Sequence, residues 1–443
     1  MQTKVYNYFS AVAILLLCSH FAAAQNGFRL LTIGFGTTIR CINDNGDAVS
    51  GGKYYSYQND VWTSRESTVS ELVSLTNGGQ VSGSMPYDTI AGTYQPAYRD
   101  ASGMWHAIGW FNSTANADDY FTTYKISHNG RFVTGQMSQS NFISSVFKYD
   151  AQSSSLQQIA TPTNQSIAAY GVNDAGFTVG WYDTEFNGGG TFREACYTDA
   201  SNAIHFIPTV SGTHTQGTAN DISDSNIIVG EMDTTAFIYN VTTNTLQNFA
   251  PIGGYTSMSF TAVSNTGVAV GYAQKFGDFG SLIRDAVVYA PQFGTQPRFL
   301  KTILEAHGIV VNTPDSLVGT AYTISANGRY IAGWNGPYIF GYGFIIDLQE
   351  VLATTPAPKY AALAIAPNPA SHYIYLQNIQ KFIDLGTTQP AAFKISDILG
   401  KTVLTKPITD FNAPINIGDL PSGVYITSLK IGQQEFSTKL MVE

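Results

Sequence analysis

The middle of the chain is organised by a short pattern of apolar and turn-forming residues that recurs seven times. A typical copy has an aliphatic residue, then Ser, Thr or Asn, two turn-type residues, a Gly, and a short β-type run that ends on a second Gly. The copies run over residues 42–51, 75–83, 126–135, 172–180, 222–230, 263–271 and 324–333. Such self-similarity predicts a series of equivalent supersecondary units.

One copy indicates the backbone conformation of the turn. In residues 222–230, Asn226 stands where the other copies have the first Gly. A turn residue with positive φ accepts Gly freely and Asn next best. We therefore expect a tight turn with a left-handed residue at this place in every unit.

A second apolar element follows the turn and sets the length of the unit. Residues 146–150 and 236–240 both carry Phe and Tyr at matching places, and their offset of 90 residues corresponds to two units of about 45. Units of this length with three or four short strands are typical of β-propeller blades. We predict an all-β protein with a propeller of about seven blades over residues 25–350, with six or eight blades as alternatives. A strand at 28–33 is expected to pair with the last unit and close the ring.

The repeats resemble a known extracellular type, the HAF repeats. These pair an Ile-Asn-x-x-Gly-x-x-Val-Gly stretch with an Ala-Phe-x-Trp-like strand, and residues 222–230 followed by 236–239 are the nearest match in this chain. The resemblance implies a secreted, propeller-like domain. It implies no enzymatic activity, because that family has no shared catalytic residues.

The repeat ends before a segment containing Pro356 and Pro358, which predicts an exposed linker over residues 351–360. Beyond it, residues 361–443 carry alternating strands separated by turn signals, such as the run Phe393–Asp397. This pattern predicts a small β-sandwich of the immunoglobulin-like kind.

Four landmarks in this last segment resemble the type A C-terminal sorting domain of type IX secretion substrates. They are a Pro-Asn-Pro start, an Asp-x-x-Gly-Lys strand end, a Leu-x-x-Gly-Val-Tyr turn and a closing strand with Lys. The residues that carry them are Pro367, Asn368, Pro369, Asp397, Gly400, Lys401, Leu420, Gly423, Val424, Tyr425 and Lys439. The resemblance implies the type IX secretion machinery as a partner, and a passenger that is attached to the cell surface or released.

The N-terminus predicts a Sec signal peptide over residues 1–24. Lys4 precedes an apolar run, and small residues at Ala22 and Ala24 place the cleavage between Ala24 and Gln25. The apolar run is shorter than the roughly 20 residues needed to span a bilayer, so we expect no transmembrane segment in the mature chain. The expected location is extracellular or at the outer-membrane surface, reached through the periplasm.

Charge and cysteine content narrow the partners. A net charge of −9 and a pI near 5.2 argue against binding to nucleic acid. Cys41 and Cys196 are the cysteines left after signal removal. One disulfide between them is conceivable in an oxidising compartment, but we favour two small buried apolar residues.

A search for chemistry gives no catalytic, cofactor or metal site. The histidines are scattered, and none has the spacing of a zinc-binding helix. Asp44, Asn45 and Asp47 could contact calcium, but the same places in other units hold different residues, such as His128 or Asp174. No ligand set recurs, so turn chemistry is the favoured interpretation.

Four aromatic residues follow glycines of the repeated units. They are Trp110, Trp181, Tyr272 and Trp334. Exposed on one rim they could stack on sugars, whereas packing between blades is the favoured role.

Two functions remain. The first is a non-enzymatic propeller that serves as a binding or adhesion platform for a glycan or protein ligand. The alternative is a secreted polysaccharide hydrolase or lyase with its acids on blade loops.

Overall fold

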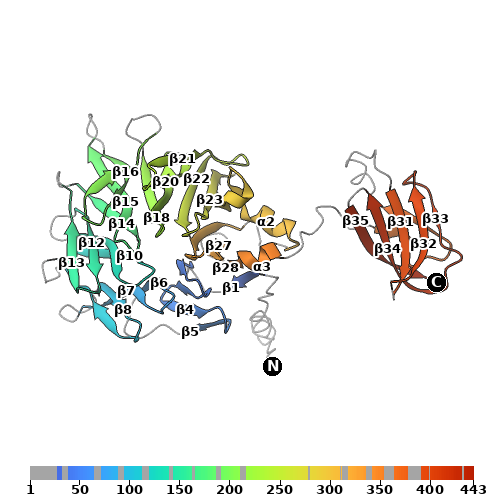
Figure 1. Ribbon diagram of the computed structural model, residues 1–443, viewed down its shortest axis with the longest axis horizontal. Helices are drawn as coiled ribbons and strands as arrows, with labels where there is room; N and C mark the ends of the chain where they lie inside the picture. Colours follow the sequence, from blue (N-terminus) through green and yellow to red (C-terminus); the bar gives the residue numbers. More distant parts are fainter. Residues whose placement is uncertain are drawn as a thin grey trace, which may run out of the picture. The chain divides into compact units, whose positions relative to one another are not determined.

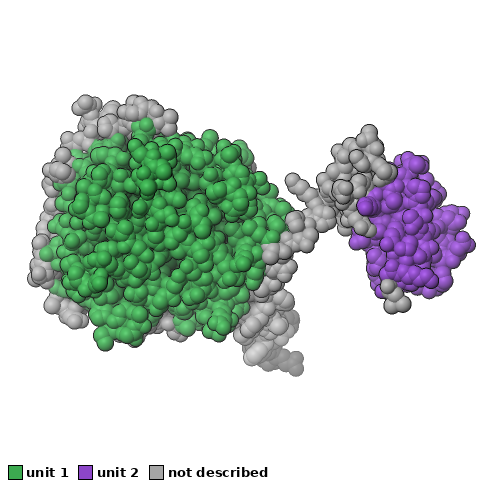
Figure 2. Space-filling model, viewed as in Figure 1, with its two compact units in different colours: residues 1–357 green, residues 358–443 purple. Residues whose placement is uncertain are grey.

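The computed structural model divides the 443-residue chain into two compact units, residues 1–357 and 358–443 (Figure 2). The described residues are 27–31, 38–63, 71–87, 94–111, 119–138, 143–161, 165–185, 191–209, 216–277, 280–309, 311, 318–335, 342–353, 364–377, 391–398, 400–431 and 434–443. The predicted signal peptide, its cleavage site at Ala24 and Gln25, and the linker prolines lie outside them.

The first unit is a β-propeller of seven four-stranded antiparallel sheets arranged in a ring (Figure 1). The first strands of successive sheets contact one another, which places them innermost. Each turn between a first and a second strand is one copy of the sequence repeat, so the seven copies correspond to seven blades. The predicted fold class and blade number are confirmed.

Blades 1 to 4 contain, from the inner to the outer strand, β2 (Cys41–Ile42), β3 (Ala48–Ser50), β4 (Lys53–Ser56) and β5 (Val61–Thr63); β6 (Glu71–Leu75), β7 (Val81–Pro86), β8 (Tyr94–Arg99) and β9 (Trp105–Ala107); β10 (Tyr120–Ile126), β11 (Phe132–Ser138), β12 (Ser145–Asp150) and β13 (Ser155–Ile159); and β14 (Ile167–Val172), β15 (Thr178–Glu185), β16 (Thr191–Thr198) and β17 (Ile204–Phe206).

Blades 5 to 7 contain, in the same order, β18 (Gly217–Ile222), β19 (Ile227–Met232), β20 (Thr235–Asn240) and β21 (Thr245–Phe249); β22 (Ser257–Val263), β23 (Ala269–Phe276), β24 (Leu282–Tyr289) and β25 (Arg298–Phe299); and β26 (Thr320–Ile324), β27 (Tyr330–Asn335), β28 (Tyr342–Asp347) and β1 (Phe28–Leu31).

The ring is closed by the N-terminal strand. β1 forms the outer edge of blade 7 and pairs antiparallel with β28, with Phe28 opposite Ile346 and Leu31 opposite Gly343. Blade 1 in turn packs against blade 7 through β2, β26 and β27. The predicted closing strand is therefore confirmed over 28–31, and residues 32 and 33 lie outside the described part. Closure couples the start of the domain to its end.

The two glycines of the repeat have different physical causes. The first has positive φ, as at Gly176 (81°), and Asn226 adopts 58° in its place, as the turn prediction requires. The second glycine lies against the backbone of the first strand of its blade. In blades 2 to 7 the first strand carries an irregularity in register, and its carbonyl presses against this glycine. A Cβ on Gly271 would lie 1.9 Å from the Ser259 carbonyl oxygen, so only glycine fits.

Recurrent apolar side chains fill the spaces between the sheets. Phe147, Phe237 and Phe344 of the third strands are fully buried, which explains the second element of the repeat. Trp110 and Trp181 are also buried, so the packing interpretation holds for these two.

Cys41 and Cys196 are buried and free. This confirms that they serve as small buried residues. Burial raises the pKa of the Cys196 thiol well above its usual range.

Short helices occur next to blades 6 and 7. They are α2 (Leu300–Ala306), α3 (Leu348–Ala353) and the 3₁₀ turn η2 (Pro291–Phe293). α3 buries Leu348 and Val351 in the core, so the propeller extends three residues into the segment predicted as linker. None of the helices in the described residues is long and apolar enough to cross a bilayer.

The second unit is a β-sandwich. A four-stranded sheet of order β32 (Thr402–Ile408), β31 (Ala391–Asp397), β34 (Gly423–Ile431) and β35 (Gln434–Val442) faces a three-stranded sheet of β29 (Ala364–Ala366), β30 (Tyr373–Gln377) and β33 (Ile415–Asn416). Side chains from both sheets, including Ile374 and Phe393, form one core. The alternating pattern of this segment predicted that arrangement.

The outer hairpin of blade 4 leads us to expect a loss of stability in acid. The Asp199 carboxylate accepts hydrogen bonds from Ser201 Oγ (2.6 Å) and His205 Nε2 (2.9 Å), and these hold its pKa well below the usual range. Because the folded-state pKa is depressed, this contribution is present above about pH 4 and lost as pH falls further. We expect the unfolding midpoint to fall from pH 5 to pH 2, and Asp199→Asn to reduce that slope. Midpoints that fall equally steeply in both proteins would contradict this.

Candidate functional site

One end of the propeller is bordered by a ring of equivalent turns. The third residue of each repeat copy occupies the same place in its turn, and we call these seven positions the turn ring. They are Asp44, Asn77, His128, Asp174, Asp224, Asn265 and Ala326. Each turn connects a first strand to a second strand, so the turn ring marks one face of the propeller, the turn face.

Most neighbouring turns are joined by hydrogen bonds through these residues. The backbone N–H of Asp174 donates to Asp224 Oδ1 at 2.9 Å, and that of Asp224 donates to Asn265 Oδ1 at 2.8 Å. The Asn327 N–H donates to Asp44 Oδ1 at 2.8 Å, which links the last blade to the first. The side chains at these positions thus satisfy turn donors of the preceding blade and hold the blades together.

Two side-chain pairs join blade 3 directly to blade 5, past blade 4. Lys125 Nζ of blade 3 lies 3.1 Å from Asp221 Oδ1 of blade 5, with side chains 17% and 6% exposed. Three residues further along the same two repeat copies, His128 Nδ1 lies 2.7 Å from Asp224 Oδ2. Gly171 occupies the position of Lys125 in the blade between them, and a Cβ there would come within 3.2 Å of Asp221 Oδ1. The absence of a side chain at Gly171 in blade 4 therefore leaves room for the Lys125–Asp221 pair.

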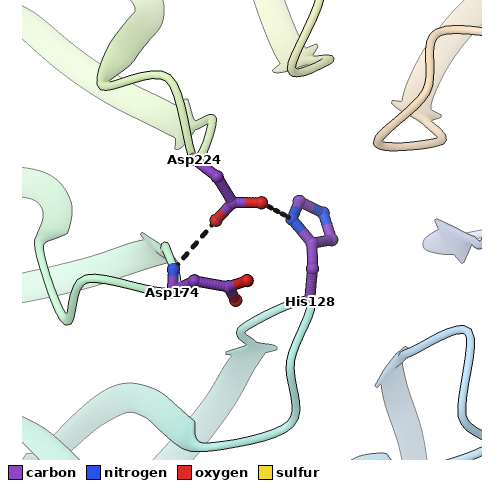
Figure 3. A group of neighbouring side chains, drawn as sticks. All are labelled: His128, Asp174 and Asp224. Carbon is purple, nitrogen blue, oxygen red and sulfur yellow. Dashed lines mark hydrogen bonds and ion pairs between the residues drawn. The ribbon is translucent and has the colours of Figure 1, made fainter.

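His128 also meets a second carboxylate, that of Asp174. Suitable donor atoms of His128, Asp174 and Asp224 all lie within 4.8 Å of one another. Figure 3 shows the imidazole facing the Asp224 carboxylate, with the Asp174 carboxylate pointing into the space beside that pair. Three consecutive blades each supply one side chain, so the packing of neighbouring blades assembles this group.

The two carboxyl groups differ in acidity. Burial and the neighbouring Asp224 charge raise the pKa of Asp174, against the hydrogen bond from the Asn129 N–H. Burial also acts to raise the pKa of Asp224, but hydrogen bonds and the charge of His128 outweigh it and lower that pKa to about 2. The surroundings thus stabilise the ionised carboxylate of Asp224, whereas they disfavour that of Asp174.

A small pocket lies beside this group on the axis. Blades 1, 2, 3 and 7 line it, and both Lys125 and His128 border it, together with polar residues such as Asn43 and Asn77. The Lys125–Asp221 and His128–Asp224 pairs lie on the side of blades 4 and 5, whereas the pocket lies on the side of blades 1, 2 and 7.

The opposite end of the propeller, the loop face, carries exposed aromatic side chains. Tyr94 and Tyr342 begin third strands, Tyr120 begins a first strand and Phe276 ends a second strand, and antiparallel topology places all four there. Their exposed fractions are 41%, 39%, 39% and 69%. Partly buried Tyr272 adds to them, with the Arg284 guanidinium stacked 4.1 Å from its ring centroid.

The group of His128, Asp174 and Asp224 was missed by sequence reasoning. That reasoning sought a ligand set within one repeat copy, as in the calcium hypothesis for Asp44, Asn45 and Asp47. In the structure Asp44 and Asp47 accept protein hydrogen bonds instead, from Asn77 and Tyr57. The available signal was the third position of the repeat compared across adjacent copies, because a closed ring brings equivalent positions together.

The predicted sorting residues lie in the second unit and have evident structural roles. Asn368 joins the start of the unit to its last strand: its Nδ2 donates to Lys439 O and its Oδ1 accepts the Met441 N–H, both at 2.8 Å. Asp397 Oδ1 accepts the Lys401 N–H, and Gly400 has φ of 84° in that turn. Other contacts stabilise the third landmark.

In that landmark, the Tyr425 hydroxyl donates to Pro421 O at 2.8 Å. Leu420 packs against the core, while Val424 on β34 is exposed. Pro367 and Pro369 both follow cis peptide bonds, and Gly423 begins β34. The first three landmarks thus lie in separate turns. Asn368 joins the first of these turns to the last strand, β35.

The Asn368 contacts lead to a testable expectation. Asn368→Ala removes two hydrogen bonds to β35, and we expect a loss of about 1–2 kcal/mol from this unit. Amide hydrogen exchange at residues 439–442 of the full chain should speed up. Gln377→Ala, which alters an exposed side chain of the same unit, is the control. Unchanged exchange in Asn368→Ala would refute the bridging role.

Comparison with known proteins identifies the second unit. A family model described as the secretion system C-terminal sorting domain matches residues 364–443. No curated protein matches the chain.

Solved structures show similarity to the whole chain at low identity. The extracellular domain of the hybrid two-component system BT3049 from B. thetaiotaomicron is 12% identical, covering 95% of this chain and 58% of its own, with a TM-score of 0.44. PorZ, a surface component of the type-IX secretion system of Porphyromonas gingivalis, is 12% identical with the same coverages and a TM-score of 0.41. This chain therefore spans 58% of the length of either structure.

Proposed function

We propose, from the premise that residues 364–443 are a secretion system C-terminal sorting domain, that this chain delivers a glycan-binding propeller to the cell surface or extracellular space. The sorting domain implies export by the type IX route through contact with its machinery. The propeller then acts as a binding and adhesion platform without catalysis of its own. A Sec signal peptide at residues 1–24 would provide the first step of export.

The observation that carries this proposal is the set of exposed aromatic rings on the loop face. Tyr94, Tyr120, Phe276 and Tyr342 come from blades 2, 3, 6 and 7. Aromatic side chains are enriched at binding surfaces, and their flat rings stack well on sugar faces. Their distribution over several blades suits an extended ligand that crosses the face.

A glycan array with the secreted protein tests the proposal. The variant Phe276→Ser/Tyr342→Ser should lose about tenfold in affinity, since each ring contributes about 0.5–1.5 kcal/mol. Met104→Ser is the matched control, because Met104 is 62% exposed but lies in a turn at the other end of blade 2. Absence of glycan binding, or equal binding by the double variant, would overturn the proposal.

A second candidate, polysaccharide hydrolysis, is favoured by one observation. Carboxylate oxygens of Asp174 and Asp224 lie within 4.8 Å, and the two pKa values are shifted in opposite directions, as in acid and base pairs of glycosidases. These acids lie on turns, whereas the sequence hypothesis placed them on blade loops. Hydrolysis of a polysaccharide panel that Asp174→Asn abolishes would establish this candidate, and inactivity of the wild type would exclude it.

A further inference from the structure

We propose that His128, Asp174 and Asp224 form a binding site for a divalent transition-metal ion such as Zn²⁺ on the turn face of the propeller. The site is independent of the sorting domain and of the proposed glycan surface. It joins blades 3, 4 and 5 through one ion.

The donor set fits such an ion. An imidazole nitrogen with two carboxylates is a common environment for Zn²⁺, while Ca²⁺ prefers oxygen ligands alone. Ligand atoms around tetrahedral zinc are about 3.4 Å apart, given bonds of about 2.0–2.2 Å. His128 Nδ1 and Asp224 Oδ2 are 2.7 Å apart, and the Asp174 carboxylate lies within 4.8 Å of both. Side-chain shifts of about an ångström would complete the geometry.

The surrounding hydrogen bonds already orient two of the ligands. Asp224 Oδ1 accepts the Asp174 N–H at 2.9 Å, and Asn265 Nδ2 donates to Asp224 Oδ2 at 2.9 Å. Asp174 Oδ1 accepts the Asn129 N–H at 2.8 Å. Such outer contacts limit the rotation of ligating carboxylates and so reduce the entropy lost when a metal binds.

Local charge also favours a cation. The Lys125 ammonium group is paired with Asp221 at 3.1 Å and also feels the charge of Asp224. The carboxylates of Asp174 and Asp224 both lie within 4.8 Å of a His128 ring nitrogen. A divalent ion would neutralise both carboxylates and take the place of the proton between His128 and Asp224.

Three protein ligands leave a tetrahedral ion one ligand short, and water could occupy the remaining position. Of the three side chains, His128 also borders the axial pocket, together with Asn77 and Thr323.

The repeat itself supplies a suitable test variant. Blade 7 has Ala326 at the turn-ring position that His128 occupies in blade 3, and its turn forms the same Gly328 N–H to Ser325 O hydrogen bond as Gly130 to Ser127. Alanine is therefore compatible with this turn, so His128→Ala should fold. His205→Ala is the matched control, because His205 also pairs with one aspartate but belongs to an outer hairpin.

The experiment is a calorimetric titration of the chelator-treated full chain with Zn²⁺, with Ca²⁺ in a parallel titration. We expect one Zn²⁺ per chain, an affinity at least tenfold weaker in His128→Ala and in Asp174→Asn, and unchanged binding in His205→Ala. Zn²⁺ should also raise the unfolding midpoint of the wild type but not that of His128→Ala. The absence of Zn²⁺ binding, equal binding by His128→Ala, or Ca²⁺ binding in preference to Zn²⁺ would overturn the proposal.

Discussion

Gly83→Ala is expected to destabilise the propeller by about 3 kcal/mol or more, because the new methyl group has no space. A Cβ at this position would lie 2.1 Å from the Glu71 carbonyl oxygen, a backbone atom of the neighbouring strand β6. The strand pair would have to separate, and β6 lies against the channel between two other blades. Urea unfolding of the full chain, followed by tryptophan fluorescence, measures the loss.

Gly78→Ala is the control for this prediction. Gly78 belongs to the same repeat copy, and its nearest neighbour would lie 3.6 Å from a Cβ, an ordinary contact. Its φ lies outside the positive range, so we expect a change within about 0.5 kcal/mol. Equal unfolding midpoints for Gly83→Ala and Gly78→Ala would show that the second glycine of the repeat is not required by close approach.

Asp221→Ala is expected to cost about 3–5 kcal/mol, because it leaves the Lys125 ammonium buried without its partner. Asp221 Oδ2 also accepts the buried Val263 N–H at 3.2 Å, so the variant removes an acceptor as well as a charge. Urea unfolding and loss of near-UV circular dichroism should report the effect.

Two further variants separate these contributions. Asp221→Asn keeps an acceptor for Val263 but removes the charge, and should therefore lose less stability than Asp221→Ala. Lys125→Met combined with Asp221→Asn should recover much of it, since no unpaired charge remains buried. If Asp221→Ala unfolds at the wild-type urea concentration, the pair does not stabilise the ring.

Much of the fold could be predicted from the sequence because the repeat consists of local structural requirements. The turn glycines, Asn226 and the repeated Phe147 and Phe237 each report a local need, positive φ or a buried third strand. These needs recur once per blade, so counting them gave seven blades. The motif around Asn368 was equally local and marked the second unit.

The candidate metal group could not be found in that way. His128, Asp174 and Asp224 come from different copies and have no common spacing within one turn. Their proximity follows from the packing of blades 3, 4 and 5 against one another, which places their turns side by side. The same holds for Lys125 and Asp221, which are 96 residues apart.

The sequence by itself therefore determined the all-β class, a propeller of about seven blades and the separate sorting unit, because each rests on a repeated local pattern or on a local motif. The tertiary structure alone decided what lies on the axis. Closing the ring brings the equivalent turn positions of consecutive blades together, and there a His and two Asp residues, with a buried Lys–Asp pair beside them, acquire partners that no single repeat contains.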